Sequence, residues 1–173
     1  MRQLFRASVV TVSGPWLSER QQRVWRHWLA ASAQLPAALH RDLQAEAGLS
    51  LPDFEVLVQL TETTEGRVRV TELARALSWE KSRVSHHLTR MERRGLVTRE
   101  ECRDDGRGSF VVLTAAGRDA MEQAAPGHVA TVRRLVFDQL TEQEVDVLET
   151  VLGKVLSGLA GLERRAPPGA ESG

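Results

Sequence analysis

The residues from Lys81 to Arg94 concentrate the side chains best suited to bind an anion. They include five Lys or Arg and one Glu. At the 100° steps of an α-helix, Val84, Leu88 and Met91 fall on one side and polar residues on the other. A helix of this kind can pack its apolar side and place its cationic side in the major groove of DNA, whose width admits a helix. The candidate DNA contacts on the polar side and its flanks are Lys81, Ser82, Arg83, Ser85, His86, His87 and Arg90.

The alternative for this helix is a charged surface that is merely solvated. A solvated helix usually mixes Glu with Lys at i,i+4 spacing, but Glu is nearly absent from this outer side. Serine and the adjacent His86 and His87 are also poor helix formers, each costing up to about 0.7 kcal/mol relative to alanine. Their presence favours a binding role.

A second cationic group follows in a polar, glycine-rich loop at residues 103–108. Residues 96–100 and 109–113 flank this loop and have the character of short strands, so we expect a β-hairpin. Arg107 at its tip could reach a minor groove or a phosphate, and Asp105 could hold that guanidinium in a bidentate pair. An ordinary charged turn is the alternative, and the preceding helices make it less favoured.

The candidate DNA-binding side chains need helices and strands that hold them in place. Thr71 is expected to cap a short helix, a turn at residues 78–80 leads into the basic helix, and Gly95 is a candidate left-handed end of that helix. Ser50-x-x-Asp53 opens the helix before them. Two helices followed by a hairpin are the order of a winged helix-turn-helix, so we expect a DNA-binding domain over 50–114 within a mainly α (α+β) fold.

Long amphipathic helices are expected on both sides of this domain, over 18–48 and 115–163, with capping boxes at Ser18-x-x-Gln21 and Thr141-x-x-Glu144. Pro36 should kink or split the first. Apolar residues recur in the last helix at alternating steps of three and four, which predicts packing against another helix. Packing within the chain is the alternative, but the apolar surface is wider than one neighbour needs. We therefore expect these helices to form a dimerisation region. The two-fold symmetry of a dimer would require a palindromic DNA site. The residues predicted to form the dimer seam, the apolar stripe that meets the other helix, are Val145, Leu148, Leu152, Val155, Leu159 and Leu162.

Composition excludes several classes of protein. The 173 residues have a net charge of zero, but residues 67–113 carry eleven Lys and Arg against seven Asp and Glu, so an anionic partner would meet one face only. The single Cys102 and the absence of a signal peptide or membrane span favour the cytoplasm. No catalytic or metal-binding motif is present, so we expect no enzyme, cofactor or metal site. Residues 1–17 are expected to be a flexible arm and 164–173 a disordered tail.

Three segments carry a resemblance to a known family. Residues 70–77, WEKSRVSHHLTRMERRGLV at 79–97 and DDGRGSFVVLTAAG at 104–117 resemble the multiple-antibiotic-resistance regulator (MarR) family of bacterial transcription factors, over about residues 18–162. The resemblance implies a homodimer with a winged helix in each lobe. It also implies that Arg107 enters the minor groove, whereas His87 occupies a position that is usually apolar. The helix residues it implies as contacts to bases or phosphates are Ser82, Arg83, Ser85, His86 and Arg90.

The resemblance further implies a small phenolic or anionic effector, bound between the dimer region and the DNA lobe. Trp25, Trp28, His27 and His40 are the candidate lining, with core packing as the alternative for the tryptophans. We therefore expect a homodimeric repressor that binds a palindromic double-stranded operator and is released by a small ligand. The alternative is a winged-helix module that binds protein and no DNA. Steeply salt-dependent duplex binding would separate the two.

Overall fold

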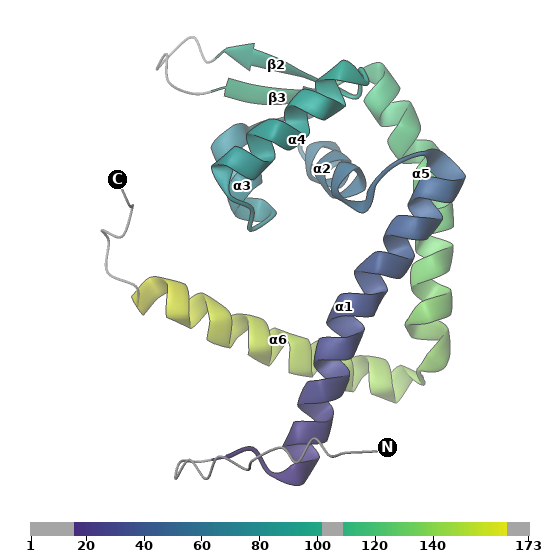
Figure 1. Cartoon of the computed structure of the whole chain (residues 1–173), viewed down its shortest axis with the longest axis vertical. Coiled ribbons are helices and arrows are strands. Elements are labelled where there is room, and N and C mark those ends of the chain that lie inside the picture. The colour runs from purple at the N-terminus through teal and green to yellow at the C-terminus, as the bar shows by residue number, and fades with distance from the viewer. Residues whose placement is uncertain (1–15, 102–108, 166–173) are drawn as a thin grey trace, which may run out of the picture. The chain divides into compact units, whose positions relative to one another are not determined.

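The computed structural model describes residues 16–101 and 109–165, with side chains as far as residue 162. The chain divides into two compact units, residues 1–35 and 36–173, which are described separately. The elements are α1 (Glu19–Ala47), α2 (Leu51–Thr61), β1 (Arg67–Arg69), α3 (Val70–Ala76), α4 (Lys81–Arg93), β2 (Val97–Glu101), β3 (Ser109–Leu113), α5 (Ala115–Leu135), the 3₁₀ turn η1 (Phe137–Gln139) and α6 (Glu142–Arg165) (Figure 1).

The core lies where α2, α3 and α4 meet the sheet, and α4 lies beside α3 and the β2–β3 hairpin (Figure 1). Each fully buried Leu or Val contributes roughly 1.5–3 kcal/mol relative to an exposed one. Because α4 shares this core with α2, α3 and the strands, its position is fixed by its apolar side. The fully buried side chains are Leu49, Val56, Leu57, Leu60, Leu73, Val84, Leu88, Met91, Val97 and Val111.

The sheet is antiparallel, with strand order β1-β3-β2. Val111 at the centre of β3 is fully buried and lies opposite Val68 in β1 and Arg99 in β2. The strands run at 67–69, 97–101 and 109–113, so the two strands expected around residues 103–108 are confirmed. A third, short strand completes the sheet on the other side of β3.

Helix starts follow their local sequence closely. Ser50 Oγ accepts the Asp53 amide at 3.1 Å, and Asp53 Oδ2 accepts the Ser50 amide at 2.9 Å. Thr141 and Glu144 pair in the same way at the start of α6, as do Ser18 and Gln21 before α1. The two capping boxes expected from the sequence, before α1 and α6, are therefore confirmed, and the Ser50–Asp53 helix start proves to be a third.

Three helix boundaries differ from expectation. Helix α1 is not split at Pro36, whose position is exposed, so water can satisfy the carbonyl that loses its donor. Helix α3 begins at Val70 after Arg69, with no side-chain cap, so Thr71 is not its N-cap. Helix α5 ends at Leu135, because Val136 leaves the helical conformation (φ −121°, ψ −68°).

None of the helices in the described part of the chain is long and apolar enough to cross a bilayer.

Candidate nucleic-acid interface

Helix α4 has a buried side and an exposed cationic side, as its sequence predicts. Val84, Leu88 and Met91 are fully buried, and Gly95 takes the left-handed conformation, φ 72°, that ends the helix. The candidate contacts that lie exposed on the opposite side are Lys81, Ser82, Arg83, Ser85, His86 and Arg90.

His87 is a correction. We expected it among the DNA contacts, but its side chain is buried, at 7% relative exposure. The ring meets Trp79 edge-on, with centroids 5.4 Å apart and planes at 87°. Its Nε2 lies 3.1 Å from Asp53 Oδ1, at an angle too bent for a well-formed hydrogen bond. A side chain enclosed in this way lies beneath the exposed surface of α4 and not on it.

Two exposed arginines of α4 lie against the rings of His87 and Trp79. The Arg90 Nη2 lies 2.9 Å from His87 Nδ1. The Arg83 guanidinium lies over the Trp79 ring, 4.2 Å from its centroid, in cation–π geometry. Both cations therefore have a defined contact on their inner side and an exposed outer side.

Asp53 connects α2 to the end of α4. Its Oδ2 accepts a hydrogen bond from Arg94 Nη1 at 2.7 Å, and Arg94 Nη2 donates to the Gly48 carbonyl at 2.9 Å. Burial alone would raise the pKa of Asp53, but the nearby His87 ring and hydrogen bonds from Ser50 and Arg94 outweigh it and hold the pKa well below its usual range. Asp53 is therefore a permanent anion at the base of α4. The sequence indicated only its capping role.

Arg99 ties β2 to the middle of α4. Its Nη2 donates to the Ser85 carbonyl at 2.7 Å and to Thr89 Oγ1 at 3.1 Å. Its Nε lies 3.1 Å from Glu92 Oε2. The helix is therefore attached to the hairpin as well as to α2, and this residue was not singled out by the sequence pattern.

The hairpin's base is described, but its tip is not. Phe110 on β3 lies between two arginines of β1, with the Arg67 and Arg69 guanidinium carbons 4.7 Å and 5.1 Å from its ring centroid. Arg107 and Asp105, predicted to form the tip, lie outside the described residues, as does Cys102.

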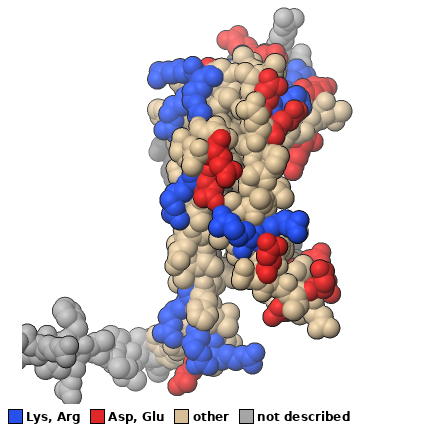
Figure 2. Space-filling model, turned by 90° about the vertical axis from the view of Figure 1, so that its right-hand side faces the viewer, with Lys and Arg blue, Asp and Glu red and all other residues tan. Residues whose placement is uncertain are grey.

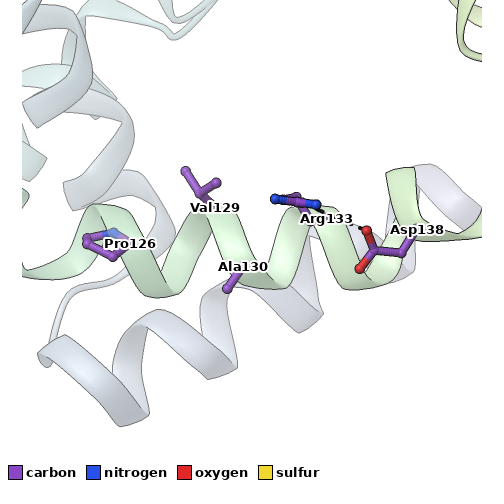
Figure 3. Close-up of a pocket in the computed structure, with 5 residues that line it drawn as sticks. All are labelled: Pro126, Val129, Ala130, Arg133 and Asp138. Atoms are coloured by element: carbon purple, nitrogen blue, oxygen red, sulfur yellow. Dashed lines mark ion pairs between the residues drawn. The ribbon is translucent and has the colours of Figure 1, made fainter. Parts of the chain in front are cut away.

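Four residues, Trp25, Trp28, His27 and His40, were predicted to line a ligand pocket. Trp25 and Trp28 are 51% and 38% exposed in the single chain, His27 is exposed, and His40 Nδ1 accepts the Leu51 amide at 3.2 Å. A hollow of about 370 Å³ is lined by residues of α5 and η1, in which Arg133 Nε lies 3.8 Å from Asp138 Oδ1 (Figure 3). The lining residues are Pro126, Val129, Ala130, Arg133 and Asp138.

The predicted seam on α6 lies largely at the surface of the single chain. Leu152, Val155, Leu159 and Leu162 are exposed, at 36–65%, whereas Val145 and Leu148 are half-buried. The alternative of packing within the chain therefore leaves most of this stripe uncovered.

Charges of both signs alternate over the face drawn in Figure 2, in keeping with the net charge of zero. No group of three or more His, Cys, Asp or Glu side chains within the described ranges could hold a metal ion.

A short helix, a turn, a second helix with an exposed cationic side and a β-hairpin define a winged helix-turn-helix protein. The MarR family model matches residues 47–108. Curated relatives include the HTH-type transcriptional repressor YetL of Bacillus subtilis (strain 168), 29% identical over 67% of this chain and 69% of that protein.

Solved structures extend the likeness over nearly the whole fold. AbsC, a MarR family transcriptional regulator from Streptomyces coelicolor, is 41% identical with a TM-score of 0.81, covering 86% of this chain and 99% of that one. Sco3205, a MarR family regulator from the same organism solved in complex with DNA, is 40% identical with a TM-score of 0.81, covering 84% and 91%. This chain belongs to the MarR family. It is a transcriptional regulator and not an enzyme, as expected from its sequence.

Proposed function

We propose that this protein is a sequence-specific regulator that binds a palindromic double-stranded operator as a homodimeric repressor. The observation that carries the proposal is the arrangement of α4, whose apolar side is fully buried while Lys81, Arg83 and Arg90 lie exposed on the other side. This is the arrangement that major-groove reading requires. Binding to a chromosome also implies a cytoplasmic location.

The relatives support the same proposal. Sco3205 was solved in complex with DNA, and YetL is named a transcriptional repressor. The proposed DNA contacts are Lys81, Ser82, Arg83, Ser85, His86 and Arg90 on α4, with Arg107 at the hairpin tip supported by Asp105.

The dimer is supported by the exposed apolar residues of α6. We propose that residues 18–48 and 115–163 form the dimerisation region and 50–114 the DNA-binding domain, with 1–17 and 164–173 outside both. Two-fold symmetry then sets two α4 helices about 34–36 Å apart, one turn of DNA, on a palindromic operator.

The test begins with selection of the bound sequence from random duplexes by the purified full-length protein. Arg90→Ala should then weaken binding to the selected duplex by about 1–3 kcal/mol, because a lost base or phosphate contact costs this much. Fluorescence anisotropy measures the affinity at several salt concentrations.

Arg67→Ala is the matched control, since Arg67 is an exposed arginine of β1 outside both the proposed DNA contacts and the proposed dimerisation region. Its affinity should equal that of the unchanged protein. Weak binding that does not depend on salt would contradict the proposal and favour a winged-helix module that binds protein, because phosphate contacts lower log K by about 0.9 per tenfold rise in salt for each phosphate neutralised.

Release by a small phenolic or anionic ligand is part of the proposal and rests on family membership. Titrating the protein–operator complex with substituted phenols and benzoates tests it, with dissociation as the expected result. If none of these compounds changes the affinity for the operator, this part of the proposal is wrong.

A further inference from the structure

A buried histidine lies directly beneath an exposed arginine of α4. The Nη2 of Arg90 is 2.9 Å from Nδ1 of His87. A guanidinium has donors and no acceptor, so Nδ1 must be the acceptor and carries no proton. The ring proton of His87 is then on Nε2, which lies 3.1 Å from Asp53 Oδ1. The contacts therefore select the neutral tautomer that presents a lone pair to Arg90.

The His87 ring is held on each of its other sides. Its side chain is buried, Trp79 meets it edge-on, and Asp53 is itself fixed by Ser50 and Arg94. A ring enclosed in this way cannot turn easily, so Nδ1 is an acceptor at a fixed place on the helix. A group built on rigid elements and supported from behind is the arrangement that holds a binding side chain in a productive geometry.

We infer that His87 is a positioning residue that orients the Arg90 guanidinium for DNA before DNA is bound. The inference rests on the proposed function and extends it to a residue that touches no DNA. Arginine loses rotamer entropy when it is immobilised, and an arginine already held loses less on binding. One bond to His87 leaves the remaining N–H donors of the guanidinium for a base or a phosphate.

Three substitutions of His87 separate this role from simple packing. The amide oxygen of His87→Asn lies near the place of Nδ1 and keeps an acceptor for Arg90. His87→Gln places its amide near Nε2 and keeps the contact to Asp53 instead. His87→Leu keeps neither. We expect His87→Asn to retain affinity for the selected operator, whereas His87→Gln and His87→Leu lose about tenfold, as expected for one charge-assisted hydrogen bond.

The effect should require Arg90. In the Arg90→Ala background, adding His87→Leu should weaken operator binding less than twofold further, because residues that act through one contact are not additive. Thr63→Ala is the control, since it removes a side-chain hydrogen bond to the Leu60 carbonyl after α2, outside the proposed contacts and the proposed dimerisation region, and it should leave operator affinity unchanged. The urea midpoint of each variant shows whether it is folded under the binding conditions.

A readout without DNA keeps the inference separate from the proposed function. In ¹⁵N NMR of the free protein, the Arg90 guanidinium should rotate slowly in the unchanged protein and in His87→Asn, and quickly in His87→Gln and His87→Leu. Equal rotation in all four proteins would overturn the inference, as would additive losses in the double variant. Failure of every protein to bind duplex would instead overturn the proposed function.

Discussion

Asp53 serves two helices at once. Its carboxylate completes the capping box of α2 and also accepts from Arg94 at the end of α4. Hydrogen bonds to a buried carboxylate outweigh the cost of its burial, so its pKa lies well below its usual range. The stability that it contributes is fully present above its ordinary pKa of 3.8 and is lost only as pH falls through the lower folded value. At neutral pH the attachment of α4 to α2 therefore does not depend on small changes in acidity.

His128 behaves in the opposite way. It lies on α5, with its ring centroid 4.3 Å from that of Phe54 on α2, and burial lowers its pKa from 6.5. Because the folded protein favours the neutral ring, the stability it contributes is complete above pH 6.5 and is lost as pH falls through the lower folded pKa.

We predict that the urea concentration at the midpoint of unfolding decreases as the pH is lowered from 7 to 5. It should decrease less in His128→Phe, whose side chain cannot be protonated. His27→Phe is the control, since His27 is exposed, and its pH dependence should match that of the unchanged protein. Parallel pH profiles for His128→Phe and the unchanged protein would contradict the prediction.

Side-chain contacts between residues that lie close together in sequence could be predicted. Ser50 with Asp53 and Thr141 with Glu144 are three residues apart, so their pairing follows from helix geometry alone. The contacts of Asp53 with His87 and Arg94 join residues more than thirty positions apart, and no local pattern encodes such a meeting. For this reason His87 was assigned to the DNA surface, although helical steps placed it only at the flank of the polar side.

At the scale of elements, the junction between the hairpin and α5 is closely packed. Thr114 Oγ1 donates to the Gly95 and Leu96 carbonyls, at 2.7 Å and 3.0 Å, and accepts the Gly117 amide at 2.9 Å. Gly117 is buried, and a Cβ there would overlap the Leu96 carbonyl oxygen. The first turn of α5 can therefore approach the backbone before β2 only because residue 117 has no side chain.

We predict that Gly117→Ala lowers the free energy of unfolding by about 1–3 kcal/mol, the usual cost of forcing extra volume into a packed site. Gly127→Ala is the matched control in the same helix. Its Cβ would meet only the end of the flexible Glu46 side chain, and alanine favours a helix over glycine by up to about 1 kcal/mol. Urea unfolding measures both. Equal changes for the two substitutions would show that the junction is not tightly packed.

Element boundaries were predictable where a cap or a glycine marks them and not elsewhere. Gly95 marks the end of α4 and was expected to do so. No such residue marks the end of α5, where Gln139 Nε2 donates to the Arg134 carbonyl at 3.2 Å and η1 follows. Pro36 should kink or split α1, and the structure contradicts only the split, because an exposed proline costs one hydrogen bond without excluding the turns on either side.

At the scale of the whole molecule, the distribution of apolar surface is the strongest argument for assembly. The proposed DNA-binding residues are held by a core that lies within one chain, whereas the apolar residues of α6 are mostly uncovered. Contiguous exposed apolar surface of this kind marks an interaction site in a folded protein. Residues spaced at alternating steps of three and four are suited to packing against another helix, and a second copy of the chain would supply one.

We predict that Leu152→Glu converts a dimer into a monomer and weakens operator binding by at least about tenfold, since one half-site contact would be lost with the partner. A buried carboxylate in an apolar interface costs several kcal/mol unless it is paired, whereas the monomer would lose little, because Leu152 is already 36% exposed there. Light scattering coupled to size exclusion gives the mass.

Lys154→Glu is the control, because it adds a carboxylate at an exposed polar position of the same helix and should remain dimeric. A Leu152→Glu protein that keeps the mass of the unchanged protein would show that α6 does not hold the two copies together.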